Sequence, residues 1–423
     1  MDADQTSPKR FVIISTGLES VGLDEYHYTK AVLEAARDRG YEVHAWGRKD
    51  AEEIRGEPWF RAVFSEPRHK APGDSYLRCA WRAARRELAW FGELRKTLKN
   101  LPWSPGDKVF VHTFRLSSAW QWWWLQKWFA TRKVHLFLFL RFSPSFVPMS
   151  RNRRWLYLFF IRRLGAYPRY IHLLTVSEEV RLEYARIIHR AIYVLNQIVP
   201  STFSDAQWDD QRAEPSLKGV TTVGFVGHAR LEKGFDLLPE AIRWLSQKLP
   251  EESVRFLIQC YAEEMHRNEP EYMNALERLK KMQSRARNIK LIESPLSFTD
   301  YARFLSSIDI ALHPHRATSQ YAIVPSGTFA DAVVMGKQCV VSDGTWLAGQ
   351  VRALDWGQIF RSGDAADLAD AIVRAIESWR RGERLSTGKR AAWVRKHQPG
   401  ELVTFLEELA KGSIAGDDAP PSA

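Results

Sequence analysis

Two stretches in the second half of the chain combine glycines with basic or hydroxyl side chains, in patterns that suit the binding of phosphate. The first stretch follows an apolar segment and contains Gly227, His228, Arg230 and Lys233. Glycines after a strand leave backbone N–H groups open to an anion, and Arg and Lys side chains pair with phosphate oxygens. We therefore expect a phosphate site here. From spacing alone, the alternative is a surface loop with solvated basic residues.

The second stretch, over residues 325–343, has the features of a helix start that binds an anion. Ser326 is placed to cap the helix, and Gly327 allows a ligand to approach the N–H groups of Gly327 and Thr328 at the positive helix end. Asp331, one turn further, is placed to accept hydrogen bonds from ribose hydroxyls, as acidic residues do in dinucleotide sites. The alternative is plain capping and a solvated carboxylate.

Three histidines lie at the ends of predicted strands. His112 is a candidate hydrogen-bond partner or proton acceptor for a ligand, and a buried histidine bonded to backbone is the alternative. His313 and His315 have no neighbouring carboxylate or cysteine, so we expect them to line a pocket and not to bind a metal. The Asp-x-Asp triplet at residues 2–4 lies in a predicted tail.

The composition favours a globular protein made in the cytosol. The chain has 423 residues, 45% of them hydrophobic. Its cysteines, Cys79, Cys260 and Cys339, are odd in number and far apart, so they do not form a disulfide framework. No apolar signal-peptide core precedes the first predicted strand. The longest apolar runs are far below the roughly 20 residues that cross a bilayer, so we expect no transmembrane span.

Basic and aromatic residues are concentrated in one part of the chain. Residues 61–170 contain 22 Lys or Arg against 5 Asp or Glu, and 9 of the 17 tryptophans. Such a mixture suits an anionic membrane surface, and nucleic acid is the rival partner. The stretches 81–99 and 120–133 have helical spacing, so helices packed on a sheet are the simpler alternative.

Short apolar segments alternate with helical patterns along the chain, which indicates an α/β fold. The segment 10–16, a helical pattern ending at Gly40 and the segment 41–46 form a strand–helix–strand unit. This unit implies a parallel sheet with ligand loops at the carboxyl ends of its strands. Further strands are predicted at 108–112, 134–140, 171–176, 191–195, 221–226, 254–259, 289–292, 308–313 and 338–342. Helices are predicted at 235–249, 270–286, 299–306, 326–336, 365–380 and 401–410.

A polar stretch divides this alternation into two similar sets, which predicts two Rossmann-like domains. The expected parts are an N-terminal domain over 1–200, a linker over 201–219, a C-terminal domain over 220–390, a C-terminal helix over 391–411 that packs back on the N-terminal domain, and a disordered tail over 412–423.

The order of these motifs resembles glycosyltransferase family 4 and related group 1 enzymes. Their GT-B fold consists of two Rossmann-like domains facing a central cleft, and the resemblance implies that the N-terminal domain binds the acceptor and the C-terminal domain the nucleotide sugar. The family's glycine, basic residue and Lys-Gly are similar to residues 227–234, and its later acidic-Ala and Gly-basic pattern matches residues 331–337. The likeness covers about residues 10–390. Two positions depart from it: His228 stands where the family has Arg, and Ile323 where it has a Glu that contacts the donor sugar.

The resemblance implies roles for individual residues. The expected donor-binding residues are Gly227, His228, Arg230, Lys233, Ser326, Gly327, Thr328 and Asp331; the catalytic residues are His112, Arg230 and Lys233; the acceptor-binding residues are Gly17, Asp24 and Glu25. Asp24 or Glu25 would orient an acceptor hydroxyl, and a loop acid or helix cap is the alternative. Lys233, Arg230 and the helix end after Ser326 would stabilise the leaving diphosphate, so neither a metal nor a cofactor is expected.

Together these features predict a metal-independent hexosyltransferase that moves a hexose from a nucleotide-diphosphate sugar to a lipid-linked saccharide, with retention of configuration, in bacterial exopolysaccharide or lipopolysaccharide-type assembly. We expect a cytoplasmic protein, peripheral on the cytoplasmic face of the inner membrane. The alternatives are a soluble or protein acceptor, a non-catalytic GT-B-like nucleotide-sugar-binding protein, which Ile323 favours, and a basic nucleic-acid-binding protein. The last leaves both phosphate motifs unexplained, so nucleic acid is not an expected partner.

Overall fold

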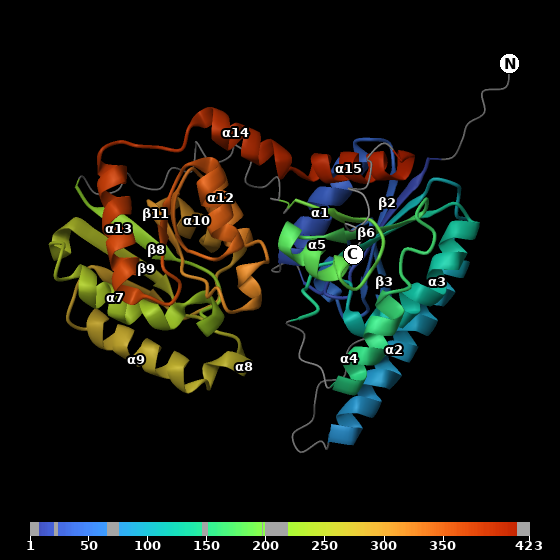
Figure 1. Ribbon diagram of the computed structural model, residues 1–423, viewed down its shortest axis with the longest axis horizontal. Coiled ribbons are helices and arrows are strands. Elements are labelled where there is room, and N and C mark those ends of the chain that lie inside the picture. The colour runs from blue at the N-terminus through green and yellow to red at the C-terminus, as the bar shows by residue number, and fades with distance from the viewer. Residues whose placement is uncertain are drawn as a thin grey trace. The chain divides into compact units, whose positions relative to one another are not determined.

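The computed structural model describes residues 8–20, 24–65, 76–145, 151–196, 198 and 219–412. The chain divides into two compact units (Figure 1). One comprises the residues up to Asn196 together with the segment from Pro399 onward, and the other spans Gln197–Gln398. Residues 201–218 of the predicted linker and the predicted tail from residue 413 lie outside the described residues.

The N-terminal unit is built on a seven-stranded parallel sheet with the order β3-β2-β1-β4-β5-β6-β7. The strands are β1 (Arg10–Ile14), β2 (Glu42–Arg48), β3 (Phe60–Phe64), β4 (Lys108–Val111), β5 (His135–Leu140), β6 (Ile171–Thr175) and β7 (Ile192–Val194). All residues of β4, β5 and β6 are buried, as expected for parallel strands covered on both faces. The edge strand β3 was not predicted, because only two of its five residues are buried and no apolar run marks it.

Five helices of this unit follow its strands in the sequence: α1 (Asp24–Arg37), α2 (Tyr76–Lys99), α3 (Ala119–Thr131), α4 (Arg151–Ile161) and α5 (Glu178–Ala185). The helices predicted at 81–99 and 120–133 are confirmed as α2 and α3. Aromatic contacts join them, since the Phe91 ring centroid lies 4.9 Å from that of Trp120 and 5.4 Å from that of Trp124. Helix α3 also packs against α4.

The segment expected as one helix over 391–411 forms two, α14 (Thr387–Lys396) and α15 (Pro399–Lys411). Proline has no N–H to continue a helix but fits a first turn, so Pro399 ends one helix and starts the next. Helix α15 packs against α1 of the N-terminal unit. Tyr41 Oη donates a hydrogen bond to Glu407 Oε1 at 2.8 Å in the same region.

The second unit contains a six-stranded parallel sheet with the order β10-β9-β8-β11-β12-β13. Its strands are β8 (Thr221–Phe225), β9 (Val254–Gln259), β10 (Ile289–Ile292), β11 (Ile310–His313), β12 (Gln338–Ser342) and β13 (Gln358–Phe360). Besides α14, the described part of this unit contains the helices α7 (Leu238–Leu245), α8 (Glu264–Arg267), α9 (Pro270–Gln283), α10 (Phe298–Ser307), α11 (Gly327–Val334), α12 (Trp346–Leu354) and α13 (Ala365–Arg380).

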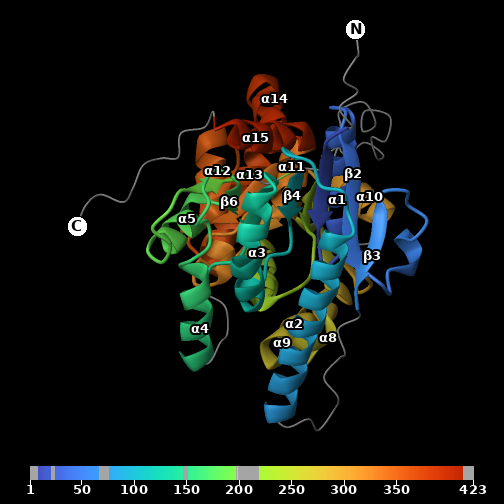
Figure 2. The same ribbon diagram turned by 90° about the vertical axis from the view of Figure 1, so that its right-hand side faces the viewer.

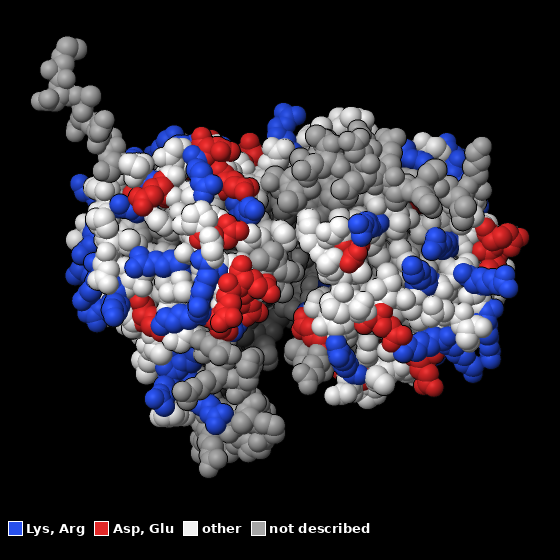
Figure 3. All heavy atoms as spheres, turned by 180° about the vertical axis from the view of Figure 1, so that it is seen from behind, with Lys and Arg blue, Asp and Glu red and all other residues white. Residues whose placement is uncertain are grey.

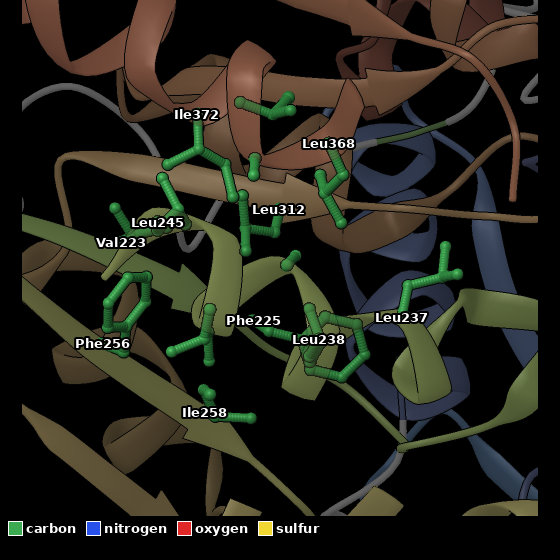
Figure 4. Close-up of a cluster of buried hydrophobic side chains, with 14 of the residues drawn as sticks. Val223, Phe225, Leu237, Leu238, Leu245, Phe256, Ile258, Leu312, Leu368 and Ile372 are labelled. Carbon is green, nitrogen blue, oxygen red and sulfur yellow. The ribbon is translucent and has the colours of Figure 1, made fainter. Parts of the chain in front are cut away.

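One face of this sheet carries a large apolar core under α7 and α13 (Figure 4). Val223 and Phe225 of β8 and Leu312 of β11 belong to the same buried cluster as Leu245 of α7 and Ile372 of α13. Apolar burial of this kind contributes roughly 25 cal/mol per Å², which makes it the main favourable term holding the sheet and these helices together.

Both sheets reverse their strand order beside their first strand, between β1 and β4 and between β8 and β11. In doubly wound sheets, ligands bind beyond the carboxyl ends of the strands at this reversal. The loops after β1, β4, β8 and β11 are therefore where each unit is expected to present its functional side chains.

Candidate active site

The two glycine-containing motifs of the second unit meet beyond the end of β8. Gly227 has a φ of 107°, and its N–H donates to Gln259 Oε1 at 2.8 Å. A Cβ placed on Gly227 would lie 3.3 Å from Lys233 Nζ and 3.6 Å from Thr328 Cγ2. The fold thus brings Gly227, Lys233 and Thr328 together from two distant parts of the sequence.

A tight turn positions Lys233. Residues Leu231–Lys233 form a single 3-10 turn that ends at Gly234, whose φ of 74° is left-handed. A Cβ on Gly234 would lie 2.0 Å from the carbonyl oxygen of Pro314, in the loop after β11. Glycine is therefore required here by both the backbone conformation and the packing, and the turn is held close to the β11 loop.

The start of α11 is built to receive an anion. Ser326 caps the helix by accepting a hydrogen bond from the N–H of Phe329 at 3.5 Å, and its Oγ lies 3.0 Å from Thr328 Oγ1. A Cβ on Gly327 would meet no atom within 4 Å, so the backbone there borders open space. The first N–H groups of a helix and its positive dipole end attract phosphate, and Lys233 lies close to the same turn.

Arg230 and His228 approach the same carboxylate, that of Glu263. Arg230 Nη2 donates to Glu263 Oε1 at 2.6 Å, and His228 Nδ1 lies 2.9 Å from the same oxygen. Arg230 Nη1 also donates to Tyr321 Oη at 3.0 Å. Burial alone would lower the pKa of Arg230, but Tyr321 and Glu263 raise it, so the guanidinium stays charged. Of the two predicted phosphate-binding cations, Lys233 lies beside the first turn of α11, whereas Arg230 contacts Glu263 and Tyr321.

Asp331 lies one turn inside α11 and is 9% exposed. Its Oδ2 accepts a hydrogen bond from Tyr301 Oη at 2.6 Å, which ties α11 to α10. The residue predicted to bind ribose therefore also has a partner within the protein.

His313 and His315 are buried beneath this site. Burial lowers the pKa of His313 to about 3 and that of His315 well below its ordinary value, and the nearby Lys233 acts in the same direction. Both rings are therefore neutral at physiological pH. In the part of the chain that the structure describes, no group of three or more His, Cys, Asp or Glu is arranged to hold a metal ion.

In the N-terminal unit, Glu25 and His112 form a hydrogen-bonded pair where β1 and β4 end. His112 Nδ1 lies 3.0 Å from Glu25 Oε1, and the hydroxyls of Ser15 and Thr113 donate to the same oxygen. Burial alone would raise the pKa of Glu25, but the hydrogen bonds from His112, Ser15 and Thr113 lower it to about 2. The carboxylate is therefore ionised at neutral pH.

His112 is enclosed and held in one orientation. Its ring stacks on Tyr28 with centroids 4.2 Å apart, and only 3% of the residue is exposed. Burial lowers its pKa, and the neighbouring Glu25 offsets this only in part. A neutral imidazole whose Nδ1–H donates to a carboxylate keeps an acceptor lone pair on Nε2. This tautomer is assigned from the hydrogen bond.

Gly17 is the residue that leaves room for this pair. A Cβ on Gly17 would lie 2.0 Å from Glu25 Oε2. Two of the three predicted acceptor-binding residues, Gly17 and Glu25, thus gather around the predicted catalytic His112. The third, Asp24, begins α1, and its side chain lies outside the described residues.

Seven residues at these sites were not predicted, among them Tyr301, which donates to Asp331, and Tyr28, which stacks on His112. Ser15 and Thr113 adjoin Gly17 and His112 at strand ends, so their position next to predicted site residues was a usable signal. Gln259, Glu263 and Tyr321 lie outside the two glycine-containing motifs, and only the fold brings them to the site.

Comparison with known proteins finds a family that matches part of the second unit, and solved structures that share the fold of the whole chain. Residues 220–378 match the family described as glycosyl transferases group 1. No curated protein sequence matches the chain.

Solved structures similar to this chain share its fold at low sequence identity. A sucrose-phosphate synthase from Thermosynechococcus elongatus has a TM-score of 0.68 and 14% identity, covering 96% of this chain and 99% of that one. An α,α-trehalose 6-phosphate synthase from Burkholderia multivorans has a TM-score of 0.66 and 15% identity, covering 96% and 99%. A trehalose-6-phosphate structure from E. coli bound with UDP-2-fluoro glucose has a TM-score of 0.65 and 15% identity, covering 95% and 99%.

Proposed function

Because the chain is a glycosyltransferase of the GT-B fold, with a group 1 domain over residues 220–378, we propose that it transfers a hexose from a nucleotide-diphosphate sugar to a lipid-linked saccharide. The proposed setting is bacterial exopolysaccharide or lipopolysaccharide-type assembly. The observation that carries the donor half of this proposal is the meeting of Gly227, Lys233 and Thr328 at the start of α11.

The donor diphosphate is proposed to lie against that helix start. The N–H groups of Gly327 and Thr328 would bind phosphate oxygens, and Lys233 would balance the charge that develops on the leaving diphosphate. Arg230 stays charged beside Tyr321 and Glu263, and would act at the edge of the same site. These groups supply the electrostatic stabilisation for which other transferases use a divalent cation, so we propose a metal-independent reaction without a cofactor.

The nucleoside is proposed to extend along α11, with Asp331 binding the ribose. The hydrogen bond from Tyr301 orients this carboxylate and keeps it near the helix start. The E. coli structure similar to this chain holds UDP-2-fluoro glucose, which makes UDP-glucose the first donor to examine.

His112 is proposed to face the donor sugar. Its Nε2 lone pair would accept a hydrogen bond or a proton from a sugar hydroxyl, and Glu25 would hold the ring in the correct tautomer. Retention of configuration is proposed on the resemblance to family 4 alone.

A lipid-linked acceptor is supported by the basic and aromatic character of the N-terminal unit. Exposed aromatic side chains on α2, α3 and α4 include Trp81, Trp124 and Trp155, which are 63%, 46% and 69% exposed. Amphipathic rings with Arg neighbours suit the headgroup region of an anionic bilayer. No helix in the described ranges is long and apolar enough to span a membrane. We therefore propose peripheral association with the cytoplasmic face of the inner membrane.

A nucleotide panel tests the donor half. The melting temperature is measured with UDP, GDP, ADP and their sugar conjugates, because a ligand that binds only the native state stabilises it by about 2.7 kcal/mol at a hundredfold excess over Kd. A selective rise with one nucleotide is expected. If no nucleotide raises the melting temperature, a membrane- or nucleic-acid-binding protein is favoured instead.

The acceptor half is tested with the donor so identified. Transfer of labelled hexose is measured with a short-chain lipid diphosphate saccharide, with glucose 6-phosphate and with a protein extract. Transfer to the lipid-linked saccharide is expected, and the anomeric configuration of the product by NMR tests retention. Transfer to the sugar phosphate alone would replace the lipid-linked acceptor by a soluble one.

A further inference from the structure

A hollow of about 710 Å³ lies on the N-terminal unit, between α3 and the turn that follows α4. Its lining combines cationic and aromatic side chains: Trp123, Trp124, Lys127, Trp128, Arg132, Arg162, Arg163, Tyr167 and Arg190, with Gln126, Thr131 and Ala166. The transfer reaction proposed above uses none of these residues.

The hollow lies at the amino ends of the strands, whereas His112 lies at their carboxyl ends. Arg132 precedes β5, Arg162 and Arg163 precede β6, and Arg190 precedes β7, whereas His112 follows β4. Because all these strands are parallel, the two places are separated by the length of a strand, on the order of 15 Å. The hollow is therefore a separate feature from the candidate active site.

A buried side chain holds the wall of the hollow in place. Gln126 is 3% exposed; its Nε2 donates to the carbonyl of Arg163 at 3.0 Å, and its Oε1 accepts from the N–H of Ala166 at 3.2 Å. Gly165 in the same turn has a φ of 71°, and a Cβ there would lie 3.2 Å from Arg190 Cδ. The turn is therefore fixed to α3 and brings Arg190 close to the other cations.

The charge of the hollow is positive. Five of its lining residues are Lys or Arg, and none is Asp or Glu. Among the described residues, none of these five cations forms an ion pair within 4.0 Å. The carboxyl ends of α3 and α4 lie here, but each contributes only about half a negative charge. The site therefore retains an excess of positive charge that suits an anion.

The absence of acidic residues from the lining of the hollow contrasts with the face of the molecule seen from behind. On the face seen from behind, basic and acidic side chains are interspersed on both units (Figure 3). Within the hollow the aromatic rings also hold the cations in position. The guanidinium carbon of Arg132 lies 4.2 Å from the Trp128 ring centroid, and that of Arg163 lies 3.6 Å from the Phe159 ring centroid.

One end of the hollow continues into an exposed apolar surface. Trp123 and Trp124 line the hollow and are 37% and 46% exposed. The Trp123 ring centroid lies 5.3 Å from that of Phe160 on α4, the helix that carries the exposed Trp155 and Leu156. Figure 2 shows α2, α3 and α4 side by side. A nucleic-acid duplex, whose bases are stacked inside, would use the cations but not this apolar surface, whereas a phospholipid uses both.

We infer that this hollow binds the phosphate headgroup of an anionic phospholipid, with the acyl chains next to Trp123, Trp124 and Trp155. The inference rests on the membrane association proposed above, and adds a defined headgroup site that is distinct from the acceptor site. Arg132, Arg162 and Arg190 bind the phosphate oxygens, and the tryptophans lie at headgroup depth.

The test compares two double variants of equal charge. Arg132→Gln/Arg162→Gln removes two cations of the hollow, and Arg37→Gln/Arg186→Gln removes two exposed arginines elsewhere on the same unit. Binding to vesicles of phosphatidylcholine, alone or mixed with phosphatidylglycerol, is measured by cosedimentation. At about 1 kcal/mol per cation near the surface, the hollow variant is expected to lose at least about tenfold in partitioning to the mixed vesicles, and the control no more than about twofold.

The outcomes separate the headgroup site from general attraction. Equal losses in both variants, or no binding of the unaltered protein to the mixed vesicles, would overturn the inference. So would a selective loss of binding to a single-stranded oligonucleotide with vesicle binding unchanged. Trp155→Ser, which alters no charge, is expected to weaken binding to both kinds of vesicle. Stabilisation by nucleotide is measured on the unaltered protein and on the variants. If the unaltered protein is stabilised by nucleotide but does not bind the mixed vesicles, the headgroup site is wrong and the transferase proposal stands.

Discussion

Glu25 and His112, 87 residues apart in the sequence, meet with Nδ1 and Oε1 3.0 Å apart, because β1 and β4 are neighbours in the sheet. The carboxylate fixes the imidazole tautomer and leaves Nε2 as an acceptor. In the proposed reaction, Glu25 is therefore a positioning residue that acts through His112. It also gives the N-terminal unit a defined polar centre beyond its strand ends.

Replacing the carboxylate is expected to change both the rate and its pH dependence. Glu25→Gln should lower kcat by about a hundredfold or more, because correctly placed proton acceptors contribute about 10² to 10⁴. Glu25 raises the pKa of His112, so its removal should move the acid limb of the kcat profile to lower pH. The profile is measured from pH 4 to 8. Asp38→Asn, an exposed acid, is the control. An unchanged acid limb would contradict the pairing.

The lowered pKa of Glu25 predicts how the stability of the N-terminal unit changes in acid. The pKa of Glu25 falls from an ordinary 4.5 to about 2 on folding, so it contributes about 3 kcal/mol above pH 4.5, and this is lost as the pH falls toward 2. Hydrogen exchange of β1 and β4 amides, corrected for intrinsic rates, is expected to show this loss. The Glu25→Gln variant should lack this component, and equal acid sensitivity in both proteins would argue against it.

Gly17 is expected to tolerate no side chain. In Gly17→Ala the new Cβ would lie 2.0 Å from Glu25 Oε2, so Glu25 must move and release His112. We expect a loss of about 1–3 kcal/mol in stability together with most of the activity. Gly56→Ala is the matched control, because a Cβ there meets nothing within 4 Å. Thermal melting and a transfer assay check both variants. A wild-type rate in Gly17→Ala would show that this contact does not matter.

Lys233 is expected to account for much of the nucleotide affinity. Lys233→Met removes a charge placed beside Gly227 and Thr328, and a hydrogen bond to a charged group is worth about 1.5–3 kcal/mol. The Kd for the preferred nucleotide, measured by calorimetry, should therefore rise at least about tenfold. Lys290→Met, at an exposed position of β10, should bind as the unaltered protein does. Equal affinities for the two variants would remove Lys233 from the site.

Gly234 and Gly382 allow packing to be separated from backbone strain. Both have a left-handed φ, of 74° and 79°, but only Gly234 faces another atom at close range, the carbonyl oxygen of Pro314. Alanine at Gly382 should cost about 1–2 kcal/mol, the ordinary penalty for this conformation. Alanine at Gly234 should cost clearly more and weaken nucleotide binding, because Lys233 moves with the turn. The measurement is the melting curve of each variant with and without nucleotide. Equal losses of stability in the two variants would show that the contact with Pro314 does not matter.

The strands that form the two sheets were predicted well because they are buried on both faces. Strand β9 and helix α13 occupy the predicted residues, and all six residues of β5 are buried. The edge strands β3 and β13 were missed, as was α12, and α14 was expected only as part of one longer helix. These two strands are short or partly exposed, so no long apolar run marks them.

The sequence named the candidate site residues one by one, but not the contacts between them. His112 and Glu25 were separate candidates, since their contact depends on which strands are neighbours. Glu263 shows the same limit: its contact with Arg230 depends on β8 and β9 lying side by side, which no local pattern encodes.

The contact between α1 and α15 has a consequence for synthesis. Tyr41 hydrogen-bonds to Glu407 and accepts a bond from Lys108 Nζ at 2.8 Å, so the N-terminal unit is assembled from both ends of the chain. During translation, helix α1 leaves the ribosome long before α15 is synthesised. The N-terminal unit therefore cannot complete its folding until the second unit has been synthesised. Until then an apolar face of α1 lacks its cover, so a chain halted before residue 399 would depend on chaperones.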